Sequence, residues 1–378
     1  MSESSQAPYT VSISDLRSKL DLSNRWEESD HGIWSAWAGS SLKFHSQKPV
    51  SNISLKIGHK TDRKDRWNGG TPSFAVSVAE NMGLNSNSPV KIKTFEAEPG
   101  TLVKLWEEPI RDCDVEIMLI DWASVLEIEG FSTPVYDPDQ FGIVNLNPSH
   151  TTEQMLFIGD SITCGLALDK SAGGQPIPRG VLDAFACRAL SILQEKHSRV
   201  LSFEALAYPG ICLVGGRREN RDSADDGELG MVDRFFHTSP WEAVPWRPRG
   251  RPRFICIALG TNDEANDVSP SVFRDTLMNF IRKLAAVFDS VKAFYIVPPF
   301  RDFHEVDSGK IHCDLVSDPI IVDDLLIEVC GHINSRMIAE YTVDGLHPTV
   351  EGHNVLADNL AGFLVDHLPP PPPAFPDE

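Results

Sequence analysis

Ser161 is the first residue whose surroundings suggest chemistry. The stretch MLFIGDSITCG sets it directly after an apolar run, at the end of a predicted buried strand and before a predicted helix. A hydroxyl at that point lies near the positive end of a helix dipole, which suits a nucleophile. Serine also caps helices in this position. Ser161 alone therefore leaves both interpretations open.

A possible base and its orienting acid lie near the other end of the chain. The stretch TVDGLHPTVEGH places Asp344 three residues before His347. The carboxylate could hold the imidazole through one ring nitrogen and leave the other to take a proton from a hydroxyl, although such pairs are often only local hydrogen bonds. His353 follows six residues later at a spacing that fits no zinc site, so we predict a structural role for it.

Two further residues could stabilise a developing negative charge. Asn262, in ALGTNDEAND, follows a predicted strand and carries an amide that can donate to an oxyanion. Gly210, in LAYPGICLVG, ends another predicted strand and offers a backbone N–H that a reacting group can approach closely. Each residue singly fits an ordinary turn. Cys164 could be proposed as a thiol nucleophile, but it has no base at a recognisable spacing and is predicted to be a buried helical residue.

The elements that must position these residues form an α/β pattern. Apolar runs at 154–159, 199–208, 253–260 and 291–299 read as strands buried on both faces, and they alternate with amphipathic helices at 181–194 and 271–288. Strands and helices in alternation predict a doubly wound parallel sheet covered by helices on both faces. Functional groups collect at the carboxyl ends of such strands, which is where Ser161, Gly210 and Asn262 fall.

The amino-terminal part has a different pattern. From about residue 32 to 131, short segments such as SNISLKIG and FAVSVAE alternate with period two between turn residues, which predicts an antiparallel β-sandwich. We therefore expect a sandwich domain over 1–146, a catalytic domain over 147–368 and a disordered proline-rich tail over 369–378. The loops at 169–180 and 215–230 follow strand ends and could border a substrate cleft or form a lid, or they could be ordinary solvated loops.

Composition narrows the class of partner. The 378 residues include 34 basic and 54 acidic side chains, a net charge of −20, which argues against nucleic acid or an anionic membrane as a partner. The first residues show no secretory signal and no segment is long and apolar enough to span a membrane. The seven cysteines include no C-x-x-C pair. We expect a cytoplasmic protein without metal or organic cofactor, and the oligomeric state is left open.

Taken together, the motifs resemble those of the SGNH (GDSL-type) hydrolases. The corresponding blocks are Gly159-Asp160-Ser161, Gly210, Gly260-Thr261-Asn262-Asp263 and Asp344-Gly345-Leu346-His347-Pro348, over roughly 153–368. The resemblance implies a catalytic triad of Ser161, His347 and Asp344, with an oxyanion hole formed by Ser161, Gly210 and Asn262. The layout is also similar to carbohydrate esterases that carry a jelly-roll-like sandwich before the SGNH domain.

These residues predict a serine esterase, for example a deacetylase, that acts on a small acylated sugar or other metabolite through an acyl-serine intermediate. One alternative is an acyltransferase with the same site, in which an alcohol or amine replaces water. Another is a glycan-binding protein in which the sandwich binds the glycan and the hydrolase domain is vestigial.

Overall fold

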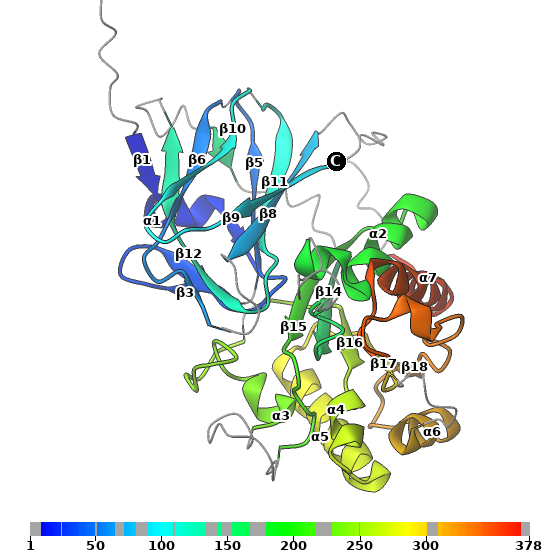
Figure 1. Cartoon of the computed structure of the whole chain (residues 1–378). Coiled ribbons are helices and arrows are strands. Elements are labelled where there is room, and N and C mark those ends of the chain that lie inside the picture. Colours follow the sequence, from blue (N-terminus) through cyan, green and yellow to red (C-terminus); the bar gives the residue numbers. More distant parts are fainter. Residues whose placement is uncertain are drawn as a thin grey trace, which may run out of the picture.

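The computed structural model describes residues 9–23, 25–49, 51–64, 72–80, 90–108, 110–133, 142–144, 153–166, 179–215, 229–248, 250–300 and 309–371. They form an antiparallel β-sandwich followed by an α/β domain (Figure 1). The predicted domain boundary at 146/147, most of the loops at 169–180 and 215–230, and most of the tail lie outside the described residues.

The sandwich consists of two antiparallel sheets. The first contains β1 (Tyr9–Ser12), β3 (Glu27–Glu28), β4 (Ile33–Ser35), β6 (Ile53–Ile57), β7 (Asp62–Arg63), β10 (Leu102–Trp106) and β12 (Ser124–Thr133). The second contains β2 (Asp21–Leu22), β5 (Ser41–Ser46), β8 (Ser73–Glu80), β9 (Lys91–Glu96), β11 (Cys113–Leu119) and β13 (Ile143–Val144). Helix α1 (Ile13–Leu16) and the short 3₁₀ helix η1 (Arg17–Lys19) follow β1. The all-β prediction for this region is confirmed.

Period-two alternation explains most of the sandwich core. In β6, Ile53, Leu55 and Ile57 are buried, while the side chains between them are partly exposed. Strand β12 differs, because all of its residues are buried. Its outward-facing Glu127 accepts a hydrogen bond from the Lys60 amide at 2.7 Å, which compensates for the loss of water. The expectation of one solvated face therefore fails at β12, the central strand of its sheet.

The second domain is built on a parallel sheet, as predicted, but the sheet has five strands and the sequence pattern indicated only the first four. Its strands are β14 (Glu153–Gly159), β15 (Leu201–Ala207), β16 (Phe254–Ala258), β17 (Ala293–Val297) and β18 (Ile327–Val329), and their spatial order is β15-β14-β16-β17-β18. The second strand in sequence therefore lies on one side of the first, and the third lies on the other. This arrangement makes the carboxyl end of β14 the topological switch point, where α/β sheets usually bind ligands.

Helices cover both faces of this sheet (Figure 1). Met155 and Phe157 of β14 share a core with α2 (Phe185–His197) and α7 (Val350–His367). Leu156 and Ile158 share the opposite core with α3 (Met231–Arg234), α5 (Pro270–Val287) and α6 (Lys310–Ser317). The other short helices within the described residues are η4 (Gly180–Asp183), α4 (Thr261–Ala265) and η5 (Ala339–Tyr341). Among the helices that the structure describes, none is long and apolar enough to cross a membrane.

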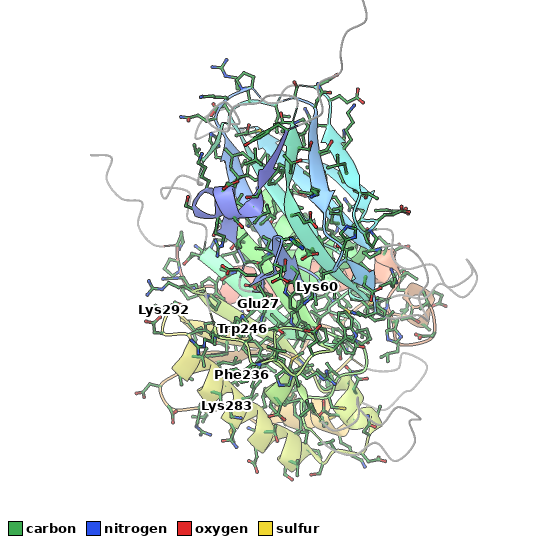
Figure 2. The ribbon with its side chains drawn as sticks, turned by 90° about the vertical axis from the view of Figure 1, so that its left-hand side faces the viewer. Glu27, Lys60, Phe236, Trp246, Lys283 and Lys292 are labelled. Carbon is green, nitrogen blue, oxygen red and sulfur yellow. The ribbon has the colours of Figure 1, made fainter. Side chains whose placement is uncertain are left out.

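A buried arginine joins the two domains. The guanidinium of Arg25, in the sandwich, lies 3.3 Å from the ring centroid of Trp246 and 4.7 Å from that of Phe235, both in the α/β domain. It also donates to the carbonyl of His237 at 3.2 Å. Figure 2 shows Trp246 at the level where the domains meet. Burial lowers the pKa of Arg25 to about 9, so the group is still charged at neutral pH and is stabilised by the aromatic rings.

Candidate active site

Ser161 follows β14 at the switch point, but the helix predicted directly after it is a single turn. The Cys164 amide donates to the carbonyl of Asp160 at 3.1 Å, and the Leu166 amide donates to that of Ser161 at 2.8 Å. Gly165 has φ +76°, the left-handed conformation that ends helices, and α2 begins only at Phe185. The prediction of a helix directly after Ser161 is therefore wrong for the described residues 161–166, which form a turn, and Ser161 does not lie at the positive end of a helix dipole.

The residues before Ser161 shape this turn. A side chain at Gly159 would overlap the side chain of Thr163, so only glycine fits. The carboxylate of Asp160 is fully buried and accepts a hydrogen bond from the Ile162 amide at 3.0 Å. Burial raises the pKa of Asp160 to about 6, against the opposing effects of that hydrogen bond and of His347. Asp160, rather than Ser161, therefore caps the turn, which leaves the serine hydroxyl for another partner.

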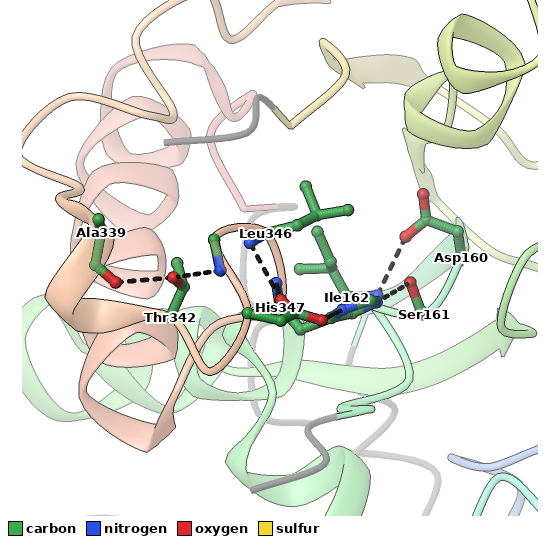
Figure 3. Close-up of polar contacts among 9 residues, drawn as sticks. Asp160, Ser161, Ile162, Ala339, Thr342, Leu346 and His347 are labelled. Carbon is green, nitrogen blue, oxygen red and sulfur yellow. Dashed lines mark hydrogen bonds and ion pairs between the residues drawn. The ribbon is translucent and has the colours of Figure 1, made fainter. Parts of the chain in front are cut away.

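That partner is His347. Its Nε2 lies 3.0 Å from Ser161 Oγ, and its Nδ1 lies 2.7 Å from Asp344 Oδ2 (Figure 3). An ionised carboxylate only accepts hydrogen bonds, so Nδ1 carries the proton and Nε2 accepts from the serine hydroxyl. Residues 186 positions apart are thus joined in the order serine, histidine, aspartate. The His347 side chain is 22% exposed, so a substrate can reach the imidazole.

The loop that carries the acid and the base is held by its own hydrogen bonds. Asp344 Oδ1 accepts from the amides of Leu346 and His347 at 3.0 and 2.8 Å. Thr342 Oγ1 accepts from the Gly345 amide and donates to the carbonyl of Ala339 (Figure 3). Partial burial raises the pKa of Asp344, but the hydrogen bonds from His347 and Leu346 outweigh it, and the net pKa lies below its ordinary value. Asp344 is therefore ionised at neutral pH.

Asn262 and Gly210 lie after the two strands that flank β14. Asn262 belongs to α4, and its Nδ2 donates to the carbonyl of Ile211 at 3.0 Å. An amide nitrogen carries two hydrogens, so the second can donate to a reactant. Gly210 has φ +74° in a turn closed by a bond from the Ile211 amide to the carbonyl of Tyr208 at 3.3 Å. Proline followed by glycine is the sequence that a type II turn favours, which accounts for Pro209.

Two other predictions from the sequence concern residues close to the site. Cys164 is buried, and burial raises the pKa of its thiol well above the ordinary value, so it is not a reactive thiolate. It lies in the turn and not on a helix. His353 is fully buried in α7, where its Nδ1 accepts from the Phe185 amide at 3.1 Å. It caps α2, for which Ala184 offers no side-chain cap.

Aromatic side chains from both domains meet beside Gly210, and the sequence did not point to them. The ring of Tyr208, two residues before Gly210, packs edge-on against Trp122 of the sandwich and Trp241 of the α/β domain. The distances between ring centroids are 6.1 Å and 5.9 Å. Trp122 and Trp241 lie outside the motifs, and no periodic pattern could have paired them. The sandwich therefore contacts the residue that begins the Gly210 turn.

The part of the chain that the structure describes contains no cluster of side chains suited to bind a metal ion. Within those residues, no group of three or more histidine, cysteine, aspartate or glutamate side chains could hold an ion. His347 and His353 have the separate partners described above.

Comparison with known proteins shows the fold. No protein-family model and no curated protein matches the sequence. A family 2 carbohydrate esterase from Cellvibrio japonicus matches the structure with a TM-score of 0.66 and 17% identity, over 95% of this chain and 98% of the other. A family 2 carbohydrate esterase from Clostridium thermocellum, in complex with cellohexaose, matches with a TM-score of 0.63 and 18% identity, over 92% and 99%.

A third structure extends the comparison beyond esterases. A salicylyl-acyltransferase from a tetracycline biosynthetic pathway matches with a TM-score of 0.58 and 12% identity, over 96% of this chain and 98% of the other. The chain therefore has the two-domain fold of the family 2 carbohydrate esterases, a parallel α/β domain preceded by a β-sandwich. At the level of the fold, the resemblance inferred from the motifs is confirmed.

Proposed function

We propose that this chain is a serine esterase of the SGNH type that removes a small acyl group from a carbohydrate or a related metabolite. The observation that supports it most directly is the 3.0 Å contact between Ser161 Oγ and His347 Nε2, with Asp344 on the other ring nitrogen. That order of hydroxyl, imidazole and carboxylate is the arrangement that activates a serine nucleophile. Its position at the switch point of the sheet supports the same conclusion.

The reaction begins when Ser161 Oγ attacks the ester carbonyl and His347 Nε2 takes the hydroxyl proton. Asp344 stabilises the imidazolium through Nδ1–H. The oxyanion accepts hydrogen bonds from the Ser161 and Gly210 amides and from the side chain of Asn262. His347 then gives its proton to the leaving alcohol, which departs and leaves an acyl-serine. Water attacks this ester by the same proton path and releases the acid.

The substrate class rests on the structural neighbours. The Clostridium thermocellum esterase is described in complex with cellohexaose, so acetylated carbohydrates are the first substrates to test. The likeness to a salicylyl-acyltransferase favours acyl transfer as a second candidate. In that reaction an alcohol replaces water in the attack on the acyl-serine. The contact between serine and histidine argues against a purely glycan-binding role. A cytoplasmic location stays a prediction from the sequence.

The test is hydrolysis of p-nitrophenyl esters from acetate to octanoate and of acetylated cello- and xylo-oligosaccharides. We expect activity that falls with acyl length, and a loss of about a millionfold in Ser161→Ala. Cys164→Ala, which removes a buried thiol three residues away, is the matched control and should keep its activity. A fluorophosphonate should label Ser161. Full activity in Ser161→Ala, or a label on another residue, would overturn the proposal.

Hydrolysis and transfer are separated by the products. Adding cellobiose to the acetate ester assay gives acetic acid alone if water is the acceptor. It gives acetylated sugar if the chain is a transferase.

A further inference from the structure

The helix that carries Asn262 also holds the loop that carries Gly210. This loop, Tyr208 to Val214, leaves the carboxyl end of β15 and contains the Gly210 turn. Asn262 reaches its middle through the bond to the carbonyl of Ile211. The next residue of α4, Asp263, reaches its far end. The two oxyanion donors from separate strands are therefore connected through consecutive residues of one short helix.

We infer that Asp263 is a positioning residue for the oxyanion hole, which fixes the loop so that the Gly210 amide faces the reacting carbonyl. Asp263 Oδ2 accepts from the Leu213 amide at 2.8 Å, and Oδ1 accepts from the Val214 amide at 2.9 Å. The residue is fully buried. Because each carboxylate oxygen holds a different amide, Asp263 fixes the direction of the loop as well as its position.

An ionised aspartate suits this task better than related side chains. Hydrogen bonds from amides to a carboxylate are stronger than those to a neutral acceptor. Asparagine has one acceptor oxygen and would turn an NH₂ group toward the second amide. Glutamate keeps both oxygens, but its extra methylene would push the loop outward. The loop has other attachments, since the Met231 amide donates to the carbonyl of Cys212 at 2.8 Å, but that bond lies on the side facing α3.

This inference rests on the proposed function, because the Gly210 amide matters only if an oxyanion forms. Displacing a catalytic group by about 1 Å can cost about a hundredfold in rate. Loss of alignment should act on the transition state and leave substrate binding nearly unchanged. Asp263 touches neither substrate nor reacting atoms in this scheme, and its effect passes through the backbone from Leu213 to Gly210.

Glu264 provides a matched control. It is the next residue of α4, and its Oε1 accepts from the Ile311 amide at 3.3 Å, at the start of α6. Like Asp263, it ties α4 to a neighbouring segment by a carboxylate-to-amide bond. The segment that it holds carries none of the proposed catalytic groups. Glu264→Gln thus makes the same isosteric change in the same helix.

The experiment compares wild type, Asp263→Asn, Glu264→Gln and Ser161→Ala by kcat, KM, thermal midpoint and inhibition by phenylboronic acid. Boronic acids form a tetrahedral adduct with a serine, with an oxygen in the place of the oxyanion. We expect kcat of Asp263→Asn to fall about ten- to a hundredfold, KM to stay within about twofold, and the boronate inhibition constant to rise in proportion to the fall in kcat. Glu264→Gln should keep all three near wild type.

The outcomes separate this inference from the proposed function. If the wild-type protein shows no ester hydrolysis that is lost in Ser161→Ala, the proposed function itself is wrong. If the wild type is active but Asp263→Asn and Glu264→Gln have equal kcat and equal boronate inhibition constants, only the positioning role of Asp263 is refuted. If Asp263→Asn does not fold, Asp263→Glu replaces it with the same expected loss in kcat, and a wild-type kcat in that variant overturns the inference.

Discussion

His347 and His353 lie six residues apart on the same segment, and their surroundings differ in each property that determines what an imidazole can do. His347 is partly exposed and lies between a carboxylate and a hydroxyl. His353 is fully buried, stacks parallel to the ring of Phe185 and accepts a backbone amide hydrogen. Burial lowers the pKa of His353 to about 3, so its ring is neutral under ordinary conditions.

The difference teaches which features make a histidine a base. A base must accept a proton and hold it for part of a reaction cycle, and a neighbouring negative charge helps because it stabilises the imidazolium. Asp344 supplies that charge to His347. His353 has its Nδ1 engaged as an acceptor, and burial penalises any positive charge on the ring. The first histidine is suited to move a proton and the second to hold a helix end.

The largest effect expected from this comparison is the loss of activity in His347→Asn. Removing the base of a triad costs about as much as removing the nucleophile, about a millionfold in kcat. Because the side chain is partly exposed, the thermal midpoint should change little. His353→Asn is the matched control and should keep most of its kcat while losing stability. Steady-state kinetics and thermal unfolding of both variants check this, and a comparable loss of kcat in the two would break the comparison.

Two asparagines allow the same comparison between a catalytic and a structural residue, with a smaller expected loss of kcat. Asn262→Ala should lose about a hundred- to a thousandfold in kcat with KM nearly unchanged, because the side chain donates to the oxyanion of the transition state. Its counterpart is Asn359, a buried residue whose Nδ2 donates to the carbonyls of Ile333 and Ser335 at 2.8 and 2.6 Å. Asn359→Ala should lower the thermal midpoint and leave kcat near wild type.

These asparagine variants separate two explanations. If Asn262 served only the turn, Asn262→Ala would resemble Asn359→Ala, with a clear loss of stability and a modest loss of kcat. Kinetics and thermal unfolding measured on the same preparations decide between them.

The smallest effect concerns the pH dependence of stability. The pKa of His353 is about 3 in the folded chain and 6.5 ordinarily, so between these values the unfolded state binds a proton that the folded state does not. Its contribution to stability is therefore complete above about pH 6.5 and is lost as the pH falls. By linkage, wild type should lose about 2 kcal/mol between pH 8 and pH 5 from this residue alone.

Urea unfolding of wild type and His353→Asn at pH 8 and pH 5 measures this contribution. Asp160, with its pKa raised to about 6, contributes the opposite trend, in which stability falls as the pH rises from about 3.8 to 6. Asp160 is present in both proteins, so its effect cancels in the difference between them. An equal change of stability with pH in the two proteins would contradict a neutral, buried His353.

Local patterns predicted the parts of this molecule that depend on near neighbours in sequence. The apolar runs predicted β14 to β17, and the spacing of Asp344 and His347 predicted their contact. The turn after Ser161 was predicted less well, because Gly165 adopts a left-handed conformation that stops a helix from forming there, and the pattern of neighbouring residues does not show that.

Contacts across the sheet and between the domains could not be predicted in this way. Asp263 follows Asn262 in the motif, but its two amide partners lie about fifty residues away. The Tyr208 contacts with Trp122 and Trp241 depend on how two domains pack. Hydrophobic periodicity reports which face of an element is buried, and it carries no information on which distant residue covers that face.

The burial of Arg25 has a consequence for the order in which the protein matures during synthesis. Trp246, whose ring covers the guanidinium, is translated about 220 residues after Arg25. At about 5–20 residues per second, the interval is about 10–45 s. During that time Arg25 has been made but the indole ring that covers its guanidinium has not. The contacts that bury Arg25 can therefore form only after the carboxyl-terminal domain has been made.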